Sequence, residues 1–450
     1  MKTKVLLASL ALLGLTLVPA ASRLGLGTPA NPAGDSPVYA IQGAKVYTLA
    51  GPPIEHGTVL IRDGKIAAVG QNVALPGEAQ VIDAKGLEVY PGLFDAISDL
   101  GLTEVGAVSA TADITDVGLY NPQLIAAMAV HPSSELIPVA RANGITHTLA
   151  TPGVAGEGGF GGEGPVIAGQ ASAIHLAGWT VEEMLIRRSV GMVLNWPSLE
   201  TRTFDFSTFS PRERPFTEAQ QEYEKKIDAL TEWMERARHY AQALAKGSPE
   251  KYDRDLKLEA LVPVVRAEMP LLVLAESKRD IKNAVEFCDK QKLKMILAGG
   301  AHAWEVKDLL KSKNIPVILG PTQALPDEED TPYDKSYSSP GELHAAGIKI
   351  AFASFNASFA RRLPYQAANA VPYGLPYEEA LRGVTLYPAQ ILGLADQLGT
   401  IESGKIANLI VTTGDPLDIP TQVRYLFING RLTSTENKHH LLYEKYRKRP

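Results

Sequence analysis

Cysteine is nearly absent from this chain of 450 residues, since Cys288 is the only one. A single thiol excludes an internal disulfide bond and every zinc cluster that is built on several cysteines. Beyond the N-terminal region, no apolar run is long enough to span a bilayer. The formal net charge is -6, whereas a nucleic-acid-binding protein usually has an excess of basic residues. We therefore expect no disulfide, no membrane span in the mature chain and no nucleic-acid partner.

Several catalytic motifs are missing as well. The chain has no G-x-S-x-G nucleophile elbow and no H-E-x-x-H metal-binding helix, and Cys288 lies among apolar neighbours in an expected helix. Gly156–Gly161 matches G-x-G-x-x-G, but a dinucleotide site needs a helix after this loop, and Pro165 interrupts the segment instead. The Gly-rich segment 153–169 is therefore either a mobile lid over a site or a plain flexible loop.

The N-terminus carries the pattern of a secretory signal. Lys2 and Lys4 precede an apolar run from Val5 to Val18, and small residues follow it. This run is short for a bilayer span, and its flanks are those of a cleavable signal peptide. We expect a signal peptide at 1–22 and a linker at 23–36, which predicts a periplasmic or secreted protein. A buried or anchoring N-terminal helix is the alternative.

Both ends of the remaining chain read as short strands. In the segment 37–90, apolar and polar residues alternate between turn signals, and Asp63-Gly64 joins two strand-like runs as a tight hairpin. The segment 398–435 repeats the same kind of pattern. We expect these two segments to form one small β-sandwich.

The middle of the chain, 91–397, alternates apolar strands with helical segments, which is typical of parallel βαβ units. A (β/α)₈ barrel is the simplest architecture for this pattern, and an open doubly wound sheet is its competitor. The expected strands are Gly144–Ala150, Gly191–Asn195, Pro270–Leu274, Lys294–Ala298, Pro316–Leu319 and Lys349–Ala353. The expected helices are Ser277–Lys290, Trp304–Lys313 and Tyr377–Leu386.

Two segments stand out by their charge. The stretch 215–246 is predicted to be a helical insert with a solvated polar face, not a coiled coil. The stretch 436–450 is a basic tail, for which a solvated, frayed terminus is expected.

Three stretches resemble the amidohydrolase superfamily, and within it the imidazolonepropionase-like periplasmic amidohydrolases. They are Val89–Gly101, which is similar to the family's first barrel strand, His131–Thr146, and the run Gly399–Val411. The last differs from the family pattern at Asn408, which replaces an aspartate of structural role. The resemblance implies a TIM barrel with a composite sheet domain, and metal-dependent hydrolysis of carbon–nitrogen bonds.

The positions where the family keeps its metal-binding and catalytic groups are altered. The first strand of the family carries two histidines, and this chain has Ile97 and Asp99 there; Leu274 stands at the histidine of the fifth strand. Phe355 replaces the aspartate that binds metal and takes a proton from water. A catalytic zinc normally needs three protein ligands, and these four positions offer only the carboxylate of Asp99. We therefore expect no catalytic group among these four residues and no bound metal.

Other polar residues are candidates for a pocket at the same end of the barrel, namely Asp99, Glu276, His302, Asn356 and Arg361. Arg361 is suited to an anionic ligand. The alternative is one divalent metal, zinc first, on Asp99 and His302. Such a site requires acids of this region, including Asp113 and Asp116, to converge with His302.

Three functions follow from these observations. The first is a non-catalytic homologue that binds an unknown small molecule or acts as the partner of a homologous amidohydrolase subunit. The second is an active hydrolase of carbon–nitrogen bonds with an atypical metal site. The third is a structural role in which the barrel mouth is a docking surface. Enzymatic activity is thus an open question at this point.

Overall fold

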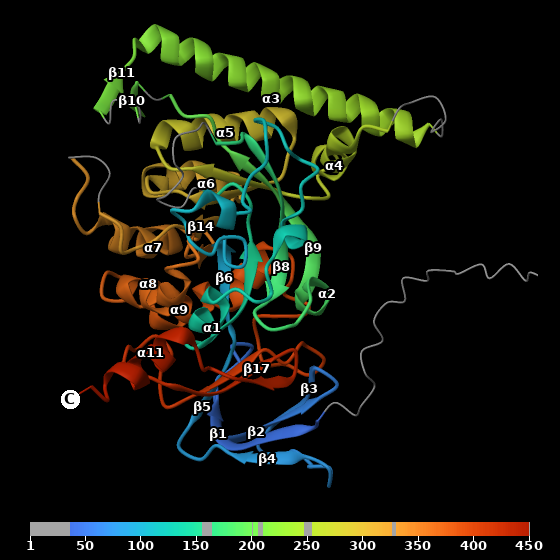
Figure 1. Ribbon diagram of the computed structural model, residues 1–450, viewed down its shortest axis with the longest axis vertical. Helices are drawn as coiled ribbons and strands as arrows, with labels where there is room; N and C mark the ends of the chain where they lie inside the picture. The colour runs from blue at the N-terminus through green and yellow to red at the C-terminus, as the bar shows by residue number, and fades with distance from the viewer. Residues whose placement is uncertain are drawn as a thin grey trace, which may run out of the picture. The chain divides into compact units, whose positions relative to one another are not determined.

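A computed structural model describes residues 37–154, 164–199, 201–205, 210–246, 254–325 and 330–449 (Figure 1). The predicted signal peptide and linker, 1–36, and the middle of the Gly-rich segment, 155–163, lie outside the described residues. The end of that Gly-rich segment is not a loop. Ile167–Gly169 begins a barrel strand, so the expectation of a lid or loop is wrong there.

The two ends of the described chain build one β-sheet, as expected from their strand patterns (Figure 1). Its eight strands run in the order β18-β17-β16-β5-β1-β2-β3, with β4 also paired to β1. The first half of β1 pairs with β4 and the second half with β5, so the sheet branches at β1. The strands are β1 (Tyr39–Val46), β2 (Ile54–Arg62), β3 (Lys65–Gly70), β4 (Gln80–Asp83), β5 (Glu88–Pro91), β16 (Leu409–Thr412), β17 (Val423–Ile428) and β18 (Arg431–Thr433).

The predicted hairpin turn between β2 and β3 is present. Asp63 and Gly64 have φ angles of 52° and 76°, the left-handed pair that this turn requires. The turn lies against the β17–β18 turn, where a Cβ atom on Gly430 would stand only 2.5 Å from the Cα of Gly64. Glycine at both turns therefore allows the N-terminal and C-terminal hairpins to meet.

The middle of the chain forms an eight-stranded barrel with the order β15-β14-β13-β12-β9-β8-β7-β6. Its strands are β6 (Leu93–Ser98), β7 (Ile145–Ala150), β8 (Ile167–His175), β9 (Leu185–Asn195), β12 (Leu271–Ala275), β13 (Met295–Gly299), β14 (Val317–Leu319) and β15 (Ile350–Phe352). The barrel architecture is confirmed, with one departure: β8 runs antiparallel to both β7 and β9. At β8 the barrel therefore departs from the all-parallel pattern of βαβ units.

Side chains of the barrel strands alternate between two apolar layers. On β12, Leu272 and Leu274 belong to the interior cluster, whereas Leu271 and Val273 pack with the surrounding helices. The strands β13, β14 and β15 show the same division. This period of two explains why these strands read as continuous apolar runs in the sequence, since both faces are buried.

Helices and short 3₁₀ turns cover the barrel (Figure 1). Ser277 caps α5 by accepting a hydrogen bond from the Asp280 amide, as its sequence position predicts. The expected helix 377–386 is shorter in the structure and ends at Gly383, because the backbone leaves the helical conformation at Val384 and Thr385, whose φ angles are -115° and -138°. The elements are η1 (Ser109–Thr111), η2 (Ala126–Ala129), α1 (Leu136–Arg141), α2 (Val181–Met184), α4 (Leu256–Val265), α5 (Lys278–Gln291), η4 (Ala303–Val306), α6 (Lys307–Ser312), α7 (Lys335–Ala345), η5 (Ala360–Arg362), α8 (Leu363–Ala370), α9 (Tyr377–Gly383) and α10 (Leu386–Ile391).

The charged stretch 215–246 contains one long helix, α3 (Phe216–Ala245), which follows the hairpin β10 (Arg202–Asp205) and β11 (Ser210–Glu213). Leu230, Met234, Ala237 and Ala241 are buried at helical spacing, and the helix packs against α4 (Figure 1). In the basic tail, residues Lys438–Tyr446 form α11, which has no buried side chain. No helix in the described parts of the chain has both the length and the apolar character needed to cross a membrane.

Candidate functional site

The carboxyl ends of the barrel strands, which we call the barrel mouth, are where a TIM barrel holds its active site. Ile97 lies near the end of β6, Leu274 near the end of β12 and Phe355 three residues after β15. All three side chains join the interior apolar cluster of the barrel, and Ile97 is fully buried. The structure thus brings the three apolar substitutions together in one packed environment.

The backbone at Phe355 is unusual. Its φ of 56° is left-handed, a conformation that a bulky residue rarely adopts and that costs roughly 1–2 kcal/mol. The Phe355 amide donates a hydrogen bond of 2.9 Å to the Ile97 carbonyl. This bond links the chain after the last barrel strand to the first strand and holds the aromatic ring at the mouth.

Asp99 is buried beneath the loop that follows β15. Its carboxylate accepts a hydrogen bond from the amide of Ala357, and its pKa is raised because burial disfavours the charged form. This carboxylate is therefore used to hold the loop at residues 355–357.

Asp95, on β6, is a further buried carboxylate. Its two oxygens accept hydrogen bonds from the amide of Ser354 at 2.8 Å and from the hydroxyl of Ser354 at 2.5 Å. Complete burial raises the pKa of Asp95 to about 7, although the bonds from Ser354 oppose the rise. The Asp95–Ser354 pair joins β6 to the end of β15, two strands that are not neighbours in the hydrogen-bonded ladder.

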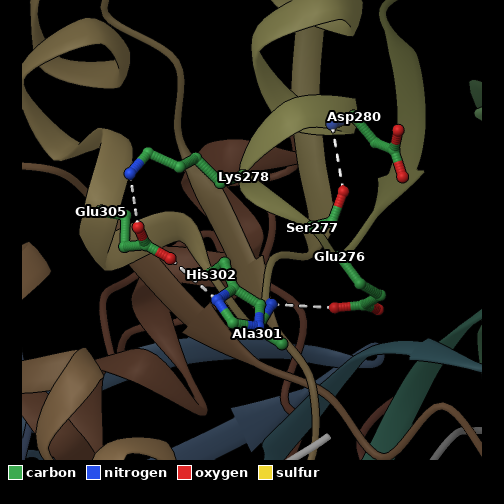
Figure 2. A network of polar contacts seen from close by, with 7 residues as sticks. All are labelled: Glu276, Ser277, Lys278, Asp280, Ala301, His302 and Glu305. Carbon is green, nitrogen blue, oxygen red and sulfur yellow. Dashed lines mark hydrogen bonds and ion pairs between the residues drawn. The ribbon is translucent and has the colours of Figure 1, made fainter. Parts of the chain in front are cut away.

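His302 lies at the start of η4, after β13, within a polar network (Figure 2). Its Nδ1 is 2.9 Å from the Glu305 carboxylate, which also binds Lys278 at 2.6 Å. Glu276 accepts a hydrogen bond of 2.8 Å from the Ala301 amide, and Figure 2 shows its side chain on the far side of His302 from Glu305. His302 is 4% exposed and is therefore a buried residue.

The carboxylate of Glu276 lies directly over Gly299. A Cβ atom on Gly299 would come within 2.0 Å of the Glu276 carboxylate, and Gly299 also has a left-handed φ of 84°. Glycine at position 299 therefore makes room for this carboxylate at the mouth.

The remaining candidates lie apart from this network or have local partners. Asp113 pairs with His131 on the surface at 2.9 Å, and Asp116 accepts a hydrogen bond from the next amide. Asn356 accepts a hydrogen bond from the Ser358 amide, and Arg361 donates one to the Ser358 carbonyl. Their side-chain bonds thus serve local turns.

A pocket of about 300 Å³ opens at the carboxyl ends of β12, β13 and β14, beside α7. We call it the mouth pocket. Glu276 and Lys335 supply its charged groups, and Leu319, Leu325 and Pro340 contribute apolar walls. Ser339 also lines it and is 4% exposed, and its hydroxyl has no hydrogen-bond partner within the described structure. A buried hydroxyl without a partner costs free energy, so a ligand that supplies one would be favoured here.

Comparisons with known proteins agree with this architecture. The model of the amidohydrolase family matches residues 272–435. Amidohydrolase tasK of Hapsidospora irregularis is 24% identical over 419 residues, which are 83% of this chain and 39% of that protein. Imidazolonepropionase of Erwinia tasmaniensis is 43% identical over 60 residues, 13% of this chain and 14% of that one. The crystal structure of an amidohydrolase from Thermotoga maritima aligns with a TM-score of 0.75 and 25% identity, over 88% of this chain and 99% of that chain.

This chain belongs to the amidohydrolase superfamily.

The superfamily resemblance raises the question of a catalytic metal, and the residues at the mouth of this amidohydrolase-superfamily chain do not fit one. Among the residues that the structure describes, no three side chains of the types His, Cys, Asp and Glu gather to hold an ion. Asp99 and His302, the two alternative ligands, are engaged by Ala357 and Glu305. Isoleucine, leucine and phenylalanine offer no donor atom.

A second buried polar cluster lies between the barrel and the sheet domain of this amidohydrolase-superfamily chain. The Asn408 amide nitrogen is 3.3 Å from Nδ1 of His147 and 3.2 Å from Nδ1 of His175, while its oxygen accepts the Asn429 amide. Burial lowers the pKa of His175 to about 4, and burial together with the neighbouring His175 lowers that of His147 well below its usual value. Both imidazoles are therefore neutral at pH 7. The sequence signal for this cluster was Asn408 alone.

Proposed function

We propose that this chain is an amidohydrolase-superfamily protein without the family's hydrolytic centre, which binds a small organic molecule at the mouth pocket. The single observation that carries the proposal is the packing of Ile97, Leu274 and Phe355 into the apolar interior of the barrel. These are the positions at which the family resemblance places a metal's ligands and the catalytic aspartate.

A divalent metal at these positions is energetically unfavourable. A divalent ion must exchange its hydration shell for protein donors, and burial of an ion without such donors costs far more than a fold can supply. The one carboxylate among the four altered positions, Asp99, is bound to a backbone amide, and burial raises its pKa. Protonation of that carboxyl weakens it further as a ligand.

The mouth pocket supports a binding function. Its volume of about 300 Å³ is at the lower end for small-molecule sites, and it combines apolar walls with a few polar groups, which is the usual composition of such sites. Gly299, Gly300 and Gly320 line the pocket, and the lack of side chains at these positions leaves space at the strand ends. A small molecule is therefore the occupant that we propose, and a homologous amidohydrolase subunit is the competing partner.

Export is part of the proposal. Its support is the sequence pattern of Lys2, Lys4 and the apolar run that follows them. N-terminal sequencing of the protein recovered from the cell envelope or medium tests it, and a mature N-terminus close to residue 23 is expected. Recovery of the protein with Met1 retained would contradict export by signal cleavage.

Metal content and turnover test the loss of the hydrolytic centre. The protein is purified without added metals, its zinc, manganese and iron are measured by mass spectrometry, and a panel of cyclic amides, dipeptides and lactones is assayed. We expect no stoichiometric metal and no hydrolysis. One metal per chain, with turnover that survives Phe355→Ala but disappears in Asp99→Asn or His302→Gln, would instead establish the second candidate, a hydrolase of carbon–nitrogen bonds.

Ligand screening by thermal shift tests the binding function. A compound that raises the melting temperature of the wild type should lose its effect in Ser339→Val, which fills the pocket and removes the hydroxyl. Ser338→Val is the matched control, because Ser338 is the adjacent position on α7 and does not line the pocket. Equal shifts in both variants would contradict binding at the mouth pocket.

A further inference from the structure

A larger cavity, of about 660 Å³, lies at the other end of the barrel. It is bounded by the start of β9, the turn before β12, the start of β13 and the turn after α6. These are the amino ends of the strands, so the cavity is separate from the mouth pocket. We call it the amino-end cavity.

The floor of the amino-end cavity is apolar. Val190, Met269, Leu293, Met295 and Ile315 line it, together with the buried Cys288. A floor of this composition favours a ligand with an apolar body, because each CH₂ group removed from water contributes about 0.8 kcal/mol.

The rim of the cavity is basic. Arg187, Lys294 and Lys313 line it, against the carboxylates of Glu268 and Asp289. An adjoining pocket of about 200 Å³ shares Asn314, Ile315, Gln390 and Ile391 with the cavity, and it adds Lys311 and Lys349. Five cations and two carboxylates thus border one continuous region of a chain whose formal net charge is -6.

Most of these cations bind neutral groups. Arg187 donates to the carbonyl of Gly393 at 2.8 Å, Lys311 to that of Gly347 at 2.8 Å, and Lys349 to the side-chain oxygen of Gln390 at 2.7 Å. Lys313 is the exception, with an ion pair of 2.8 Å to Asp289. The rim therefore keeps an excess of positive charge, because its two carboxylates balance only part of the charge of the five cations.

We propose that the amino-end cavity binds a small organic anion with an apolar body, such as a medium-chain or aromatic carboxylate or sulfonate. The apolar body lies on the floor, and the anionic group faces Arg187 and Lys294. The positive charge of the rim disfavours a cation. A neutral apolar molecule would contact the floor but would make no ion pair with the basic residues of the rim. This inference does not depend on the proposed function, since no residue of the mouth pocket takes part.

Fluorescence titration with 8-anilinonaphthalene-1-sulfonate tests the inference. This probe is an aromatic sulfonate, and its emission rises when its rings leave water. We expect saturable binding to the folded wild type, and a Kd that rises about 5-fold or more in Lys294→Glu and in Arg187→Gln, each of which removes a partner of the sulfonate. Circular dichroism and thermal melting establish that both variants are folded.

Two controls locate the probe. Lys282→Glu makes the same charge change on the exposed side of α5, outside the cavity, and it should leave the Kd unchanged. Octanoate should displace the probe, whereas inorganic phosphate at equal ionic strength should not, because phosphate has no apolar body. The inference is overturned if the Kd is the same in Lys294→Glu and Arg187→Gln as in the wild type, if Lys282→Glu weakens binding equally, or if only Ser339→Val in the mouth pocket weakens it.

Discussion

Ser354 donates two hydrogen bonds to the carboxylate of Asp95, which precedes it by 259 positions in the chain. One bond comes from the backbone amide and the other from the hydroxyl, so a single residue at the end of β15 occupies both oxygens. The bonds connect the first and last strands of the barrel at a place where no ladder pairs them. Barrel closure therefore depends on a buried ionisable group.

Asp95 should make stability depend on pH. Its folded-state pKa of about 7 lies above the ordinary value of 3.8, so its contribution is fully favourable below about pH 4 and is lost as the pH rises through 7. Asp95→Asn keeps the shape and removes the titration. At about 1.4 kcal/mol for each pH unit, the wild type should lose up to ~4 kcal/mol relative to this variant between pH 4 and pH 8.

Urea denaturation of both proteins across this range measures the difference. Asp83→Asn is the matched control, since the carboxylate of Asp83 is exposed and contacts Lys85 at the surface, through an ion pair and the Lys85 amide. Parallel stability curves for the wild type and Asp95→Asn would contradict a titrating carboxyl at this position.

The His147–His175–Asn408 cluster should make the stability of the fold depend on pH in the opposite direction, with a loss at low pH. The folded-state pKa of His175, about 4, is below its ordinary value of 6.5, so stability is lost as the pH falls below 6.5 towards 4. At pH 5 the wild type should lose about 2 kcal/mol relative to His175→Gln, which retains an acceptor for the Asn408 amide. Unfolding free energies at pH 7 and pH 5 check this, with the exposed His239→Gln as control. A loss of equal size in His175→Gln would rule out His175 as its source.

The altered mouth positions should accept a metal once donors are restored. The triple variant Ile97→His, Leu274→His and Phe355→Asp supplies three ligands beside Asp99, which is sufficient for zinc. We expect about one zinc per chain after dialysis, and a stability loss of several kcal/mol in the metal-free form, because polar groups then replace packed apolar side chains. Elemental analysis measures the gain, and Ile97→His alone should bind none. A triple variant that folds and remains free of zinc would show that these positions do not converge.

Truncation of Leu230 should test how α3 is held. This side chain is fully buried on the face of α3 that packs with the barrel helices. Leu230→Ala should lower the free energy of unfolding by roughly 2–5 kcal/mol through lost burial and the cavity left behind. Glu232→Ala, an exposed position on the same helix, should change it by less than about 0.5 kcal/mol. Chemical denaturation compares the two, and similar effects would mean that α3 is not part of the cooperative core.

The sequence predicts most barrel strands for a physical reason that β8 does not share. Runs such as Pro270–Leu274 are continuously apolar because both faces are buried, and the observed strand Leu271–Ala275 differs by one residue at each end. β8 instead contains Gly169, Gln170, Ser172 and small alanines, and it begins within the Gly-rich segment, so no apolar run marks it.

The mouth is predictable only in part. Resemblance to a family locates Ile97, Leu274 and Phe355, because each occupies a fixed place in a local strand pattern. The partnership of Asp95 with Ser354 leaves no such pattern, since the two residues meet only when the barrel closes. The same holds for His147 and His175, which both contact Asn408 from the far end of the chain.

The pairing of β5 with β16 has a consequence for the order in which the protein is made. β16 (Leu409–Thr412) lies antiparallel to β5 (Glu88–Pro91). The N-terminal strands can therefore pair with β16 only after the ribosome has synthesised nearly the whole polypeptide. Until then the N-terminal strands keep an open edge, which invites association with other chains. A newly made molecule therefore keeps an incomplete sheet until the residues of β16 have been synthesised.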